Sequence, residues 1–523
     1  MVLHLSILLF LPLAGGVLAL MGPRRGAGSC ALAATGVTLA LAVAFLVDFD
    51  AGIRGLQHVT DDRWIEELGI SYKLGVDGLN LFLVLLTALL WAAATLWSAL
   101  REWERPKLYY FHLLLAETAV LGALLAQDLA LFVVFFDLML VPFFFLVGGW
   151  GGANRVPAVT KLFIYTLVGS LLMLTGAIAT GVLAAAGAGG EVTFDLQALA
   201  RSTLPEGSQQ WIFLCFAAAF LVKMPAFPLH GWMPDGYRAM PLPVLALFSA
   251  VLSKVAAYGF LRVVLPIFPD ASATFQELML VIALASILYG SVIAFTTTDA
   301  RLILGYSSIA QLGFIVLGIF ALNGQGAQGA ILQAINHGLV VVPAFFVLAL
   351  LAERAGTEDV REMGGLALRA PVLSALFLIV TFALLAMPGS ANFAGEFLIL
   401  LGTFQDKLVY ALVASAGVVL ASVYALRLFI RAVHNRQGAG TDSRDLGRAD
   451  VLVLAPLVAL IIAFALYPQF ALRRGEAATA AAVAPAAEAA GQSPRAGGAP
   501  LAGGTARARA AAPALRAEAG VAP

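Results

Sequence analysis

Long apolar stretches separated by short polar segments dominate the chain. An α-helix needs roughly 17–25 apolar residues to cross a bilayer, and the pattern predicts an all-α polytopic membrane protein with about fourteen spans. The expected spans lie near residues 3–22, 28–47, 78–99, 109–127, 128–149, 160–186, 209–231, 241–265, 273–297, 301–322, 327–352, 371–402, 408–430 and 450–470. Nothing basic precedes the first apolar run, so we expect it to be retained as a span and not cleaved as a signal sequence.

One predicted span is interrupted beside its own charge. Lys223 follows the apolar run WIFLCFAAAFLV, and Pro225, Pro228 and Pro234 come soon after it. Proline removes a backbone donor and blocks a regular helix, and an ammonium group at the bilayer centre costs at least about 2.5–3.5 kcal/mol on insertion scales. A broken helix survives at this depth only when it is buried in protein or lines a wet cavity. The pattern therefore predicts a helix that ends just after Lys223 and indicates an ion pathway.

A second interruption surrounds Glu396. Pro388, Gly389, Asn392 and Gly395 precede this carboxylate in an otherwise apolar span, and the dipeptide Met-Pro occurs at both interruptions. Paired broken segments in corresponding halves of a chain are typical of internally repeated transporters. We therefore predict a second broken helix that carries Glu396.

Three further charges lie inside predicted spans. Asp137 has apolar neighbours on both sides and is either half of a fixed structural ion pair or a proton-carrying carboxylate coupled to a lysine, for which Lys223 is the obvious partner. Lys254 lies mid-span among small residues, which allow close helix approach and leave room for water. Glu117 either faces the helix of Asp137 or pairs locally near the interface.

Histidines and arginines leave more alternatives open. His337 lies inside a span, where it is either a proton relay or a hydrogen-bonded core residue. His230 follows the break after Lys223 and is either a relay or a cap for freed carbonyl groups. Arg262 and Arg427 lie near span ends, where we expect their side chains to extend to the interface.

Composition narrows the class of protein. Hydrophobic residues make up 61% of the chain and charged residues only 12%, with a mean hydropathy of +0.93. The net charge is zero, which argues against nucleic acid as a partner. The two cysteines have no metal or redox spacing, and no phosphate-binding glycine loop or haem-like histidine pair is present. We therefore expect no cofactor and no metal in this chain.

Basic residues are distributed unevenly between the loops. Most lie in loops after odd-numbered spans, whereas the opposite loops, including the polar loop 48–77, contain only Arg54, Arg63, Lys73, Arg201 and Lys407. The positive-inside rule places the basic loops in the cytoplasm and both termini on the far side. The Ala-, Pro- and Arg-rich tail after residue 471 is predicted to be disordered and is not counted as a span.

Several ordered motifs resemble one known family. They are VDGLN at 76–80, FFDLMLVPFFFLV at 135–147, KMPAFPLHGWMPD at 223–235, AFTTTDARLILGYSSIAQLGF at 294–314, INHG at 335–338 and PGSANFAGEF at 388–397. Together they resemble the antiporter-like, proton-pumping membrane subunits of respiratory complex I (NADH:quinone oxidoreductase) over roughly residues 70–470. The glutamate in the second broken helix favours the subunit M type, the counterpart of the fourth mitochondrial ND subunit, over its L and N relatives.

The resemblance implies an organisation of the chain. It implies three N-terminal helices in residues 1–108 and two inverted five-helix repeats in 109–265 and 273–431. A last helix at 450–470 and the tail 471–523 complete this division.

It also implies a role for each buried charge. Asp137 would pair with Lys223, Lys254 would be the central lysine, His337 a relay and Glu396 the terminal proton site. His230 and Glu117 remain possible relays. FMN, iron-sulfur clusters and quinone would belong to partner subunits, among them flanking antiporter-like chains, in an energy-transducing membrane that we expect to be the bacterial inner membrane.

The chain departs from the family pattern at a few positions. Asp137 stands where glutamate is usual and shortens the side chain by one methylene. Ala300 replaces a common lysine, and Ala310-Gln311 stands where Ser-His is frequent. We therefore expect the input route of the second repeat to depart from the family pattern more than the central axis does.

Both lines of reasoning suggest one mechanism and leave competing functions open. A lysine that loses its carboxylate partner in a buried site holds its proton less tightly, so opening of the Asp137–Lys223 pair would drive a proton through Lys254 and His337 to Glu396.

One alternative function is that of a cation/proton antiporter subunit of the Mrp type, and another is that of the membrane subunit of a hydrogenase related to complex I. A membrane scaffold whose buried charges only fix helix packing is the third.

Overall fold

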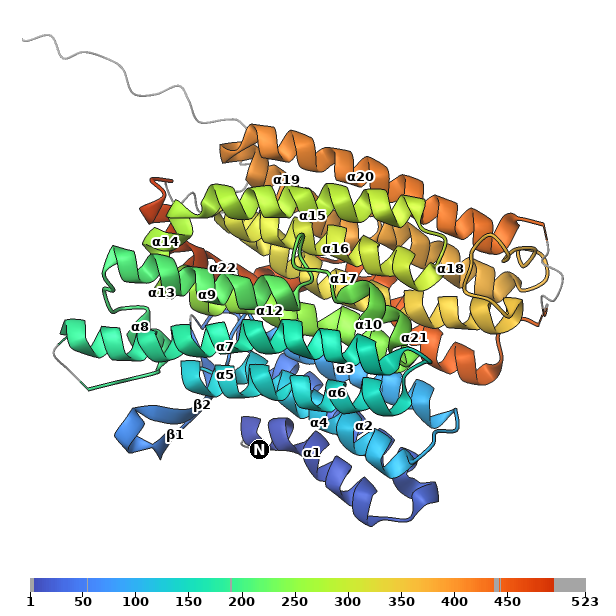
Figure 1. Cartoon of the computed structure of the whole chain (residues 1–523), viewed down its shortest axis with the longest axis horizontal. Coiled ribbons are helices and arrows are strands. Elements are labelled where there is room, and N and C mark those ends of the chain that lie inside the picture. The colour runs from blue at the N-terminus through green and yellow to red at the C-terminus, as the bar shows by residue number, and fades with distance from the viewer. Residues whose placement is uncertain (1–3, 54, 189–190, 437–441, 443, 493–523) are drawn as a thin grey trace, which may run out of the picture.

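Helices make up most of the chain and run side by side (Figure 1). The structure, a computed structural model, describes residues 4–53, 55–188, 191–436, 442 and 444–492. The helices of the first half are α1 (Leu5–Met21), α2 (Ala27–Asp48), α3 (Leu81–Ala99), α4 (Pro106–Leu125), α5 (Leu129–Leu138), α6 (Leu140–Trp150), α7 (Arg155–Ala188), α8 (Leu196–Leu199), α9 (Glu206–Lys223), α10 (Met233–Ala239), α11 (Leu242–Leu247), α12 (Ser253–Gly259), α13 (Leu265–Ile267) and α14 (Pro269–Thr274). The second half contains α15 (Gln276–Thr296), α16 (Ala300–Phe320), α17 (Gly324–Ala355), α18 (Pro371–Leu384), α19 (Ala391–Asp406), α20 (Leu408–Phe429), α21 (Arg448–Leu466) and α22 (Gln469–Ala489).

The helices are long and apolar enough for a membrane protein of many spans. Among the described residues, eleven helical segments could cross a bilayer by length and composition. The most deeply buried of them are Leu242–Ile267, Ala300–Phe320 and Gly324–Ala355, so the centre of the molecule is itself hydrophobic helix. The expectation of a mostly helical, multi-span membrane protein is confirmed.

The polar loop 48–77 contains a β-hairpin that the sequence analysis missed. Strands β1 (Gln57–Ile65) and β2 (Ile70–Val76) pair antiparallel, with Asp61 opposite Lys73. The Lys73 ammonium forms an ion pair with Asp195 at the start of α8, and the backbone N–H of Ser71 donates to Asp128 at 3.1 Å. These contacts hold the hairpin against the ends of α5 and α8. In Figure 1 it lies at the lower left, below the left ends of α5 and α7. We call this end of the molecule the hairpin end.

The opposite end of the molecule is rich in arginine and is called here the basic end. Arg238 pairs with Asp299 at 2.9 Å and Arg301 with Glu358 at 2.7 Å. The first pair joins α10 to the loop before α16, and the second joins α16 to the loop after α17. Both pairs therefore connect segments that are distant in sequence. These groups are partly exposed, so each pair contributes little on its own.

The helix that carries Lys223 breaks where the sequence predicted. Helix α9 ends at Lys223, and regular helix resumes with α10 at Met233. Polar groups of this interruption have partners inside the protein: the Trp232 indole donates to the Val222 carbonyl at 3.0 Å, and the Phe227 N–H donates to Ser286 Oγ at 3.0 Å. Buried backbone groups that lack a partner are costly in a bilayer, and these contacts reduce that cost.

The predicted broken helix at Glu396 is also present. Helix α18 ends at Leu384, and α19 begins at Ala391. Inside the interruption, the Met387 N–H donates to the Phe382 carbonyl at 3.1 Å. The break places Glu396 within the second turn of α19.

The predicted span 241–265 is interrupted in a different way. Two π-helical turns, η3 (Phe248–Leu252) and η4 (Phe260–Val264), flank the short α12 that carries Lys254. Single π-helical turns inside α-helices are frequently found at functional sites.

The disordered tail predicted from residue 471 is wrong for its first part. Residues Gln469–Ala489 form α22, which packs on α13, α14 and α17 at the hairpin end. Alanine has the highest helix propensity, and the helix buries one apolar side that includes Val483 and Ala486. The low-complexity composition hid this one-sided pattern. Residues 493–523 of the predicted tail lie outside the described part of the chain.

Glycines allow α15 and α16 to approach closely. A Cβ atom at Gly290 would lie 2.7 Å from the Tyr306 carbonyl oxygen and 2.8 Å from the Ala310 nitrogen. Such distances are too short for a side chain, so the two backbones touch only because this residue is glycine. Small residues at helix crossings have this function in membrane proteins.

We expect Gly290→Leu to lower the unfolding temperature of the protein in detergent, because overpacking a tight crossing costs about 1–3 kcal/mol or more. Gly207→Leu is the matched control, because nothing lies within 4 Å of a Cβ at that exposed position. Equal unfolding temperatures for the two variants would contradict this account of the crossing.

Candidate functional site

The predicted charges lie on helices that touch one another in series. Lys223 ends α9, Lys254 lies on α12, His337 on α17 and Glu396 on α19. Helix α9 contacts α12, α12 contacts α17, and α17 contacts α19. All four side chains are buried. The fold therefore arranges these residues, distant in the sequence, along one continuous set of packed helices, which we call the polar axis.

Lys223 is held by an aromatic ring and a carbonyl group. Its ammonium lies 4.6 Å from the centre of the Phe136 ring and donates to the Phe136 carbonyl at 3.4 Å. A cation over an aromatic face is attracted by the electrons of the ring, more strongly when water is excluded. These contacts join the end of α9 to the end of α5.

The expected contact between Asp137 and Lys223 is not present. In the described part of the chain the two charged groups form no ion pair within 4.0 Å, and Asp137 Oδ1 has no hydrogen-bond partner. Ser170 of α7 lies close to the Asp137 carboxylate. The short side chain of Asp137 accounts for the missing ion pair. Its neighbour Phe136 provides both the ring and the carbonyl group that contact the Lys223 ammonium. The two residues are nevertheless neighbours, and Lys223 is the charged group that acts on Asp137.

Lys254 has neutral oxygen partners. Its ammonium donates to the Ser249 carbonyl at 2.7 Å and to Ser253 Oγ at 3.2 Å. The π-helical turn η3 supplies the first of these oxygens, and the Ser249 hydroxyl lies 3.3 Å from the Ser308 hydroxyl of α16. A buried ammonium without a counter-ion remains costly, so these oxygens offset only part of its loss of hydration.

His337 lies near this lysine without a hydrogen bond of its own. Both ring nitrogens are buried and have no partner among the described residues. A Cβ atom at the adjacent Gly338 would lie 2.9 Å from the Ala250 carbonyl oxygen, so α17 approaches the turn next to Lys254 very closely. Lys254 is the charged group that acts on His337. The unpartnered ring is unlike the hydrogen-bonded core histidine that was the alternative interpretation.

Glu396 is bound by two glutamines. Gln311 Nε2 donates to Glu396 Oε1 at 2.7 Å, and Gln333 Nε2 lies 3.4 Å from the same oxygen and 2.5 Å from Gln311 Oε1. A Cβ atom at Gly395 would lie 2.9 Å from the Gln333 Cα atom, so this glycine lets α17 and α19 come together. The glutamine that departs from the family pattern at 311 is thus the principal partner of Glu396.

The sequence analysis missed Gln333, although a signal for it existed. Gln333, Asn336 and His337 occupy positions three and four apart in an apolar helix and therefore lie on one face. The Asn336 amide donates to the Ala391 carbonyl at 2.6 Å at the start of α19. Buried polar groups need hydrogen-bond partners, and the Gln333 and Asn336 amide nitrogens find theirs on α16 and α19, whereas the His337 ring nitrogens have none.

The two remaining candidates lie apart from these contacts. His230 is surrounded by aromatic rings, with Tyr289 at 4.8 Å and Phe227 at 5.8 Å between ring centres, and its Nδ1 has no partner. Glu117 is fully buried on α4, and neither carboxylate oxygen has a hydrogen-bond partner among the described residues. Neither residue makes a polar contact with the other candidates, so both stay predictions as relays.

Arg262 corrects a second expectation. Its side chain does not extend to the interface but forms a buried ion pair with Asp77, at 2.6 Å between Nη2 and Oδ1. The partner is 185 residues away in sequence, which is why proximity to a span end was misleading. Arg427 lies over the Phe295 ring at 5.0 Å, and its extension to the interface stays a prediction.

Within the described ranges, no group of three or more His, Cys, Asp or Glu side chains is placed to hold a metal ion. The side chains of Gln311, Gln333 and Asn336 instead form hydrogen bonds between neighbouring helices. The fold and the polar axis define a class of protein: a polytopic membrane chain with titratable residues in its helical core.

Comparison with known proteins identifies the family. The chain belongs to the family described as NADH:quinone oxidoreductase/Mrp antiporter, TM, which matches residues 126–422. It is 38% identical to NADH-quinone oxidoreductase subunit M of Rhodobacter capsulatus, over 89% of this chain and 93% of that protein. A chain in the structure of respiratory complex I from Thermus thermophilus superposes with a TM-score of 0.84 at 30% identity, covering 93% of this chain and 100% of that one.

The same fold also occurs in a chain of a second kind of membrane complex. A chain of the Mrp complex from a Dietzia species superposes with a TM-score of 0.79 at 22% identity, covering 94% of this chain and 99% of that chain. The two families of assembly therefore share this helical architecture.

We expect Gln311→Met to lower the unfolding temperature of the protein, because it removes the 2.7 Å bond to Glu396. A lost hydrogen bond to a charged group costs about 1.5–3 kcal/mol. Gln405→Met is the control, because it breaks the exposed Gln405–Gln325 bond. If both variants unfold at the same temperature, Gln311 is not a significant partner of Glu396.

Proposed function

We propose that this chain is a proton-translocating membrane subunit of an NADH:quinone oxidoreductase of the complex I type. The observation that carries the proposal is the polar axis, in which buried lysine, histidine and glutamate side chains lie on helices that touch in series. The likeness to subunit M over most of both chains supports the same conclusion. Electron transfer, with FMN, iron-sulfur clusters and quinone, belongs to partner subunits.

The proposed path begins at Lys223. Its ring and carbonyl partners hold the charged form without neutralising it, and the nearby Asp137 carboxylate adds or withdraws stabilisation as the two groups approach or separate. When Asp137 moves away, the buried ammonium holds its proton less tightly. The proton then moves toward Lys254.

The remainder of the path uses the second half of the chain. Lys254 receives the proton at a site with neutral oxygen partners, and His337, with two free ring nitrogens, passes it on between α12 and α19. Glu396 is the last site, and its second carboxylate oxygen has no partner. A histidine can accept at one nitrogen and release from the other, which is what a relay requires.

The architecture that we propose has fourteen spans with two inverted five-helix repeats. Eleven segments meet the length and hydropathy of a span. The shorter α1, the helix α9 that breaks after Lys223, and the pair α18 and α19 supply the other three. Each half of the chain contains one interrupted helix with a buried charge, and this correspondence supports two repeats.

We place the basic end in the cytoplasm and the hairpin end, with both termini, on the far side of a bacterial inner membrane. The excess of arginine and lysine in the loops of the basic end supports this orientation. Other membrane and peripheral subunits, including flanking antiporter-like chains, are the proposed partners within the bilayer.

A cation/proton antiporter subunit of the Mrp type is the second candidate, because the Mrp chain has the same fold. Glu396 counts against it, since a lysine is more usual at that position. A complex I-related hydrogenase subunit and a scaffold without transport remain as outcomes of the tests. Sodium-dependent proton exchange without NADH oxidation would favour the Mrp type.

We expect Lys254→Met and Glu396→Gln to reduce proton pumping by about tenfold or more in the assembled complex, because each removes a proton-carrying group. NADH oxidation, proton uptake and assembly on native gels are measured together in membrane vesicles. Lys107→Met at the basic end is the control. Normal pumping in either assembled variant would contradict the proposed path, and normal pumping in both would favour a scaffold.

We expect Asp137→Glu to pump within about twofold of the wild-type rate or faster, because the added methylene brings a carboxylate nearer to the Lys223 ammonium. Asp137→Asn should lose pumping, since it removes the charge while keeping the size. Initial rates of NADH-driven proton uptake distinguish the two variants. Equal rates would mean that the charge on Asp137 has no part in transport.

A further inference from the structure

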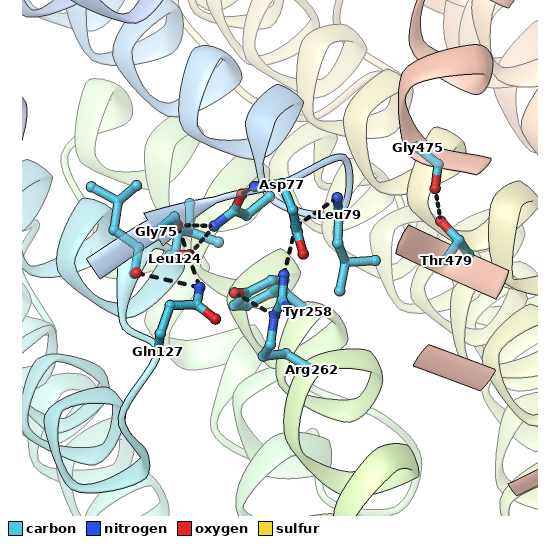
Figure 2. Close-up of polar contacts among 11 residues, drawn as sticks. Gly75, Asp77, Leu79, Leu124, Gln127, Tyr258, Arg262, Gly475 and Thr479 are labelled. Atoms are coloured by element: carbon cyan, nitrogen blue, oxygen red, sulfur yellow. Dashed lines mark hydrogen bonds and ion pairs between the residues drawn. The ribbon is translucent and has the colours of Figure 1, made fainter. Parts of the chain in front are cut away.

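The hairpin end contains a buried charge pair that the proposed path does not use. Arg262 Nη2 and Asp77 Oδ1 are 2.6 Å apart, and their side chains are only 15% and 8% exposed. Figure 2 shows how this pair is fixed: Arg262 Nε donates to the Tyr258 hydroxyl at 3.0 Å, and the Leu79 N–H donates to Asp77 Oδ1 at 2.9 Å. The guanidinium is therefore held from two sides.

This pair belongs to the same helical segment as the central lysine. Lys254, Tyr258 and Arg262 follow one another at intervals of four residues, through α12 and the π-helical turn η4. Residues four apart lie on the same side of a helix, and Arg262 does contact Tyr258. At 1.5 Å of rise per residue, Arg262 lies about 12 Å from Lys254 along the segment, toward the hairpin end.

A cavity reaches the pair from the hairpin end. Its volume is about 990 Å³, and Asp77 and Arg262 are part of its wall. Other parts of the wall come from the loop before β1, from the start of α17 and from α22, all at the hairpin end. A cavity of this size with charged walls has room for many water molecules. Water can thus approach Arg262 from the hairpin end.

Arginine differs from lysine in the property that matters for proton transfer. A guanidinium group keeps its proton in proteins and has no acceptor atom, whereas a buried lysine readily gives its proton up. Arg262 therefore cannot pass a proton from the cavity to Lys254. Asp77 and Tyr258 hold it in place, and the counter-charge of Asp77 lets it remain buried.

We propose that the Arg262–Asp77 pair, fixed by Tyr258, seals the first half of the chain against protons from the hairpin end. Lys254 then exchanges protons only along the polar axis and not with the water of the cavity. This inference rests on the proposed function, because a seal matters only if Lys254 carries protons. The structural alternative is that the pair merely fastens the residues after β2 to the π-helical turn η4.

The central test is Arg262→Lys, which keeps the positive charge beside Asp77 but introduces a group that can release a proton. The complex is purified, checked for assembly and reconstituted into liposomes. Passive proton influx is driven by a potassium diffusion potential without NADH, and NADH oxidation and pumped protons are recorded separately. We expect about a tenfold rise in passive influx, retained NADH oxidation and fewer net protons per NADH.

Two further variants keep the test decisive. Tyr258→Phe removes one of the two contacts of the guanidinium with little change in shape, and it should raise influx by a smaller factor. Arg63→Lys, on the exposed surface of β1, should leave influx at the wild-type level. If Arg262→Lys does not assemble, Tyr258→Phe provides the result.

The outcomes separate this inference from the proposed function. Wild-type influx in assembled Arg262→Lys and Tyr258→Phe would overturn the seal and leave the polar axis unaffected. Reduced stability of these variants without increased influx would mean that the pair is structural only, which also overturns it. Absence of NADH-driven pumping in the wild-type complex would instead reject the proposed function.

Discussion

The cost of burying charge and unpaired backbone groups in a membrane is the constraint on which this structure depends. An ammonium at bilayer depth is expensive, and so is a broken helix. The chain places the two together: α9 ends at Lys223, where the Phe136 ring and carbonyl receive the ammonium. The interruption that follows is closed by the Trp232 and Ser286 side chains.

In the proposed function, the kind of partner separates residues that would exchange protons from residues that would not. Lys254 and Glu396 are bound by neutral groups, namely serine oxygens and glutamine amides. Such partners lower the cost of the charge without cancelling it, so a change nearby can release or add a proton. Arg262 instead has a full counter-charge in Asp77. An ion pair with a group that always keeps its proton is suited to holding a position and not to transfer.

Local sequence patterns predicted features that depend on neighbouring residues. Prolines after Lys223 and glycines before Glu396 predicted both broken helices, and the apolar stretches predicted the multi-span fold. Contacts across the fold were not predictable in this way. Asp77 is 185 residues from Arg262, and nothing near either residue signals the other.

Two other differences between prediction and structure depend on contacts that form only after folding. The shorter carboxylate of Asp137 leaves Lys223 to Phe136, a detail of geometry that residue type alone does not determine. Helix α22 was hidden because its alanines look like low complexity, although one side of the helix is buried on α13 and α17. Both cases depend on which surface a segment meets after folding.

The most direct measurement of the central claim compares NADH oxidation with proton pumping in membranes that carry Lys223→Ala. Assembly must be verified on native gels, because truncating the buried Lys223 side chain to Ala leaves a cavity, and a cavity destabilises the fold independently of transport. The account predicts that both activities collapse in an assembled complex, since Lys223 belongs to a coupled proton path. Unchanged NADH oxidation together with loss of sodium/proton exchange would contradict it and identify the chain as an antiporter subunit.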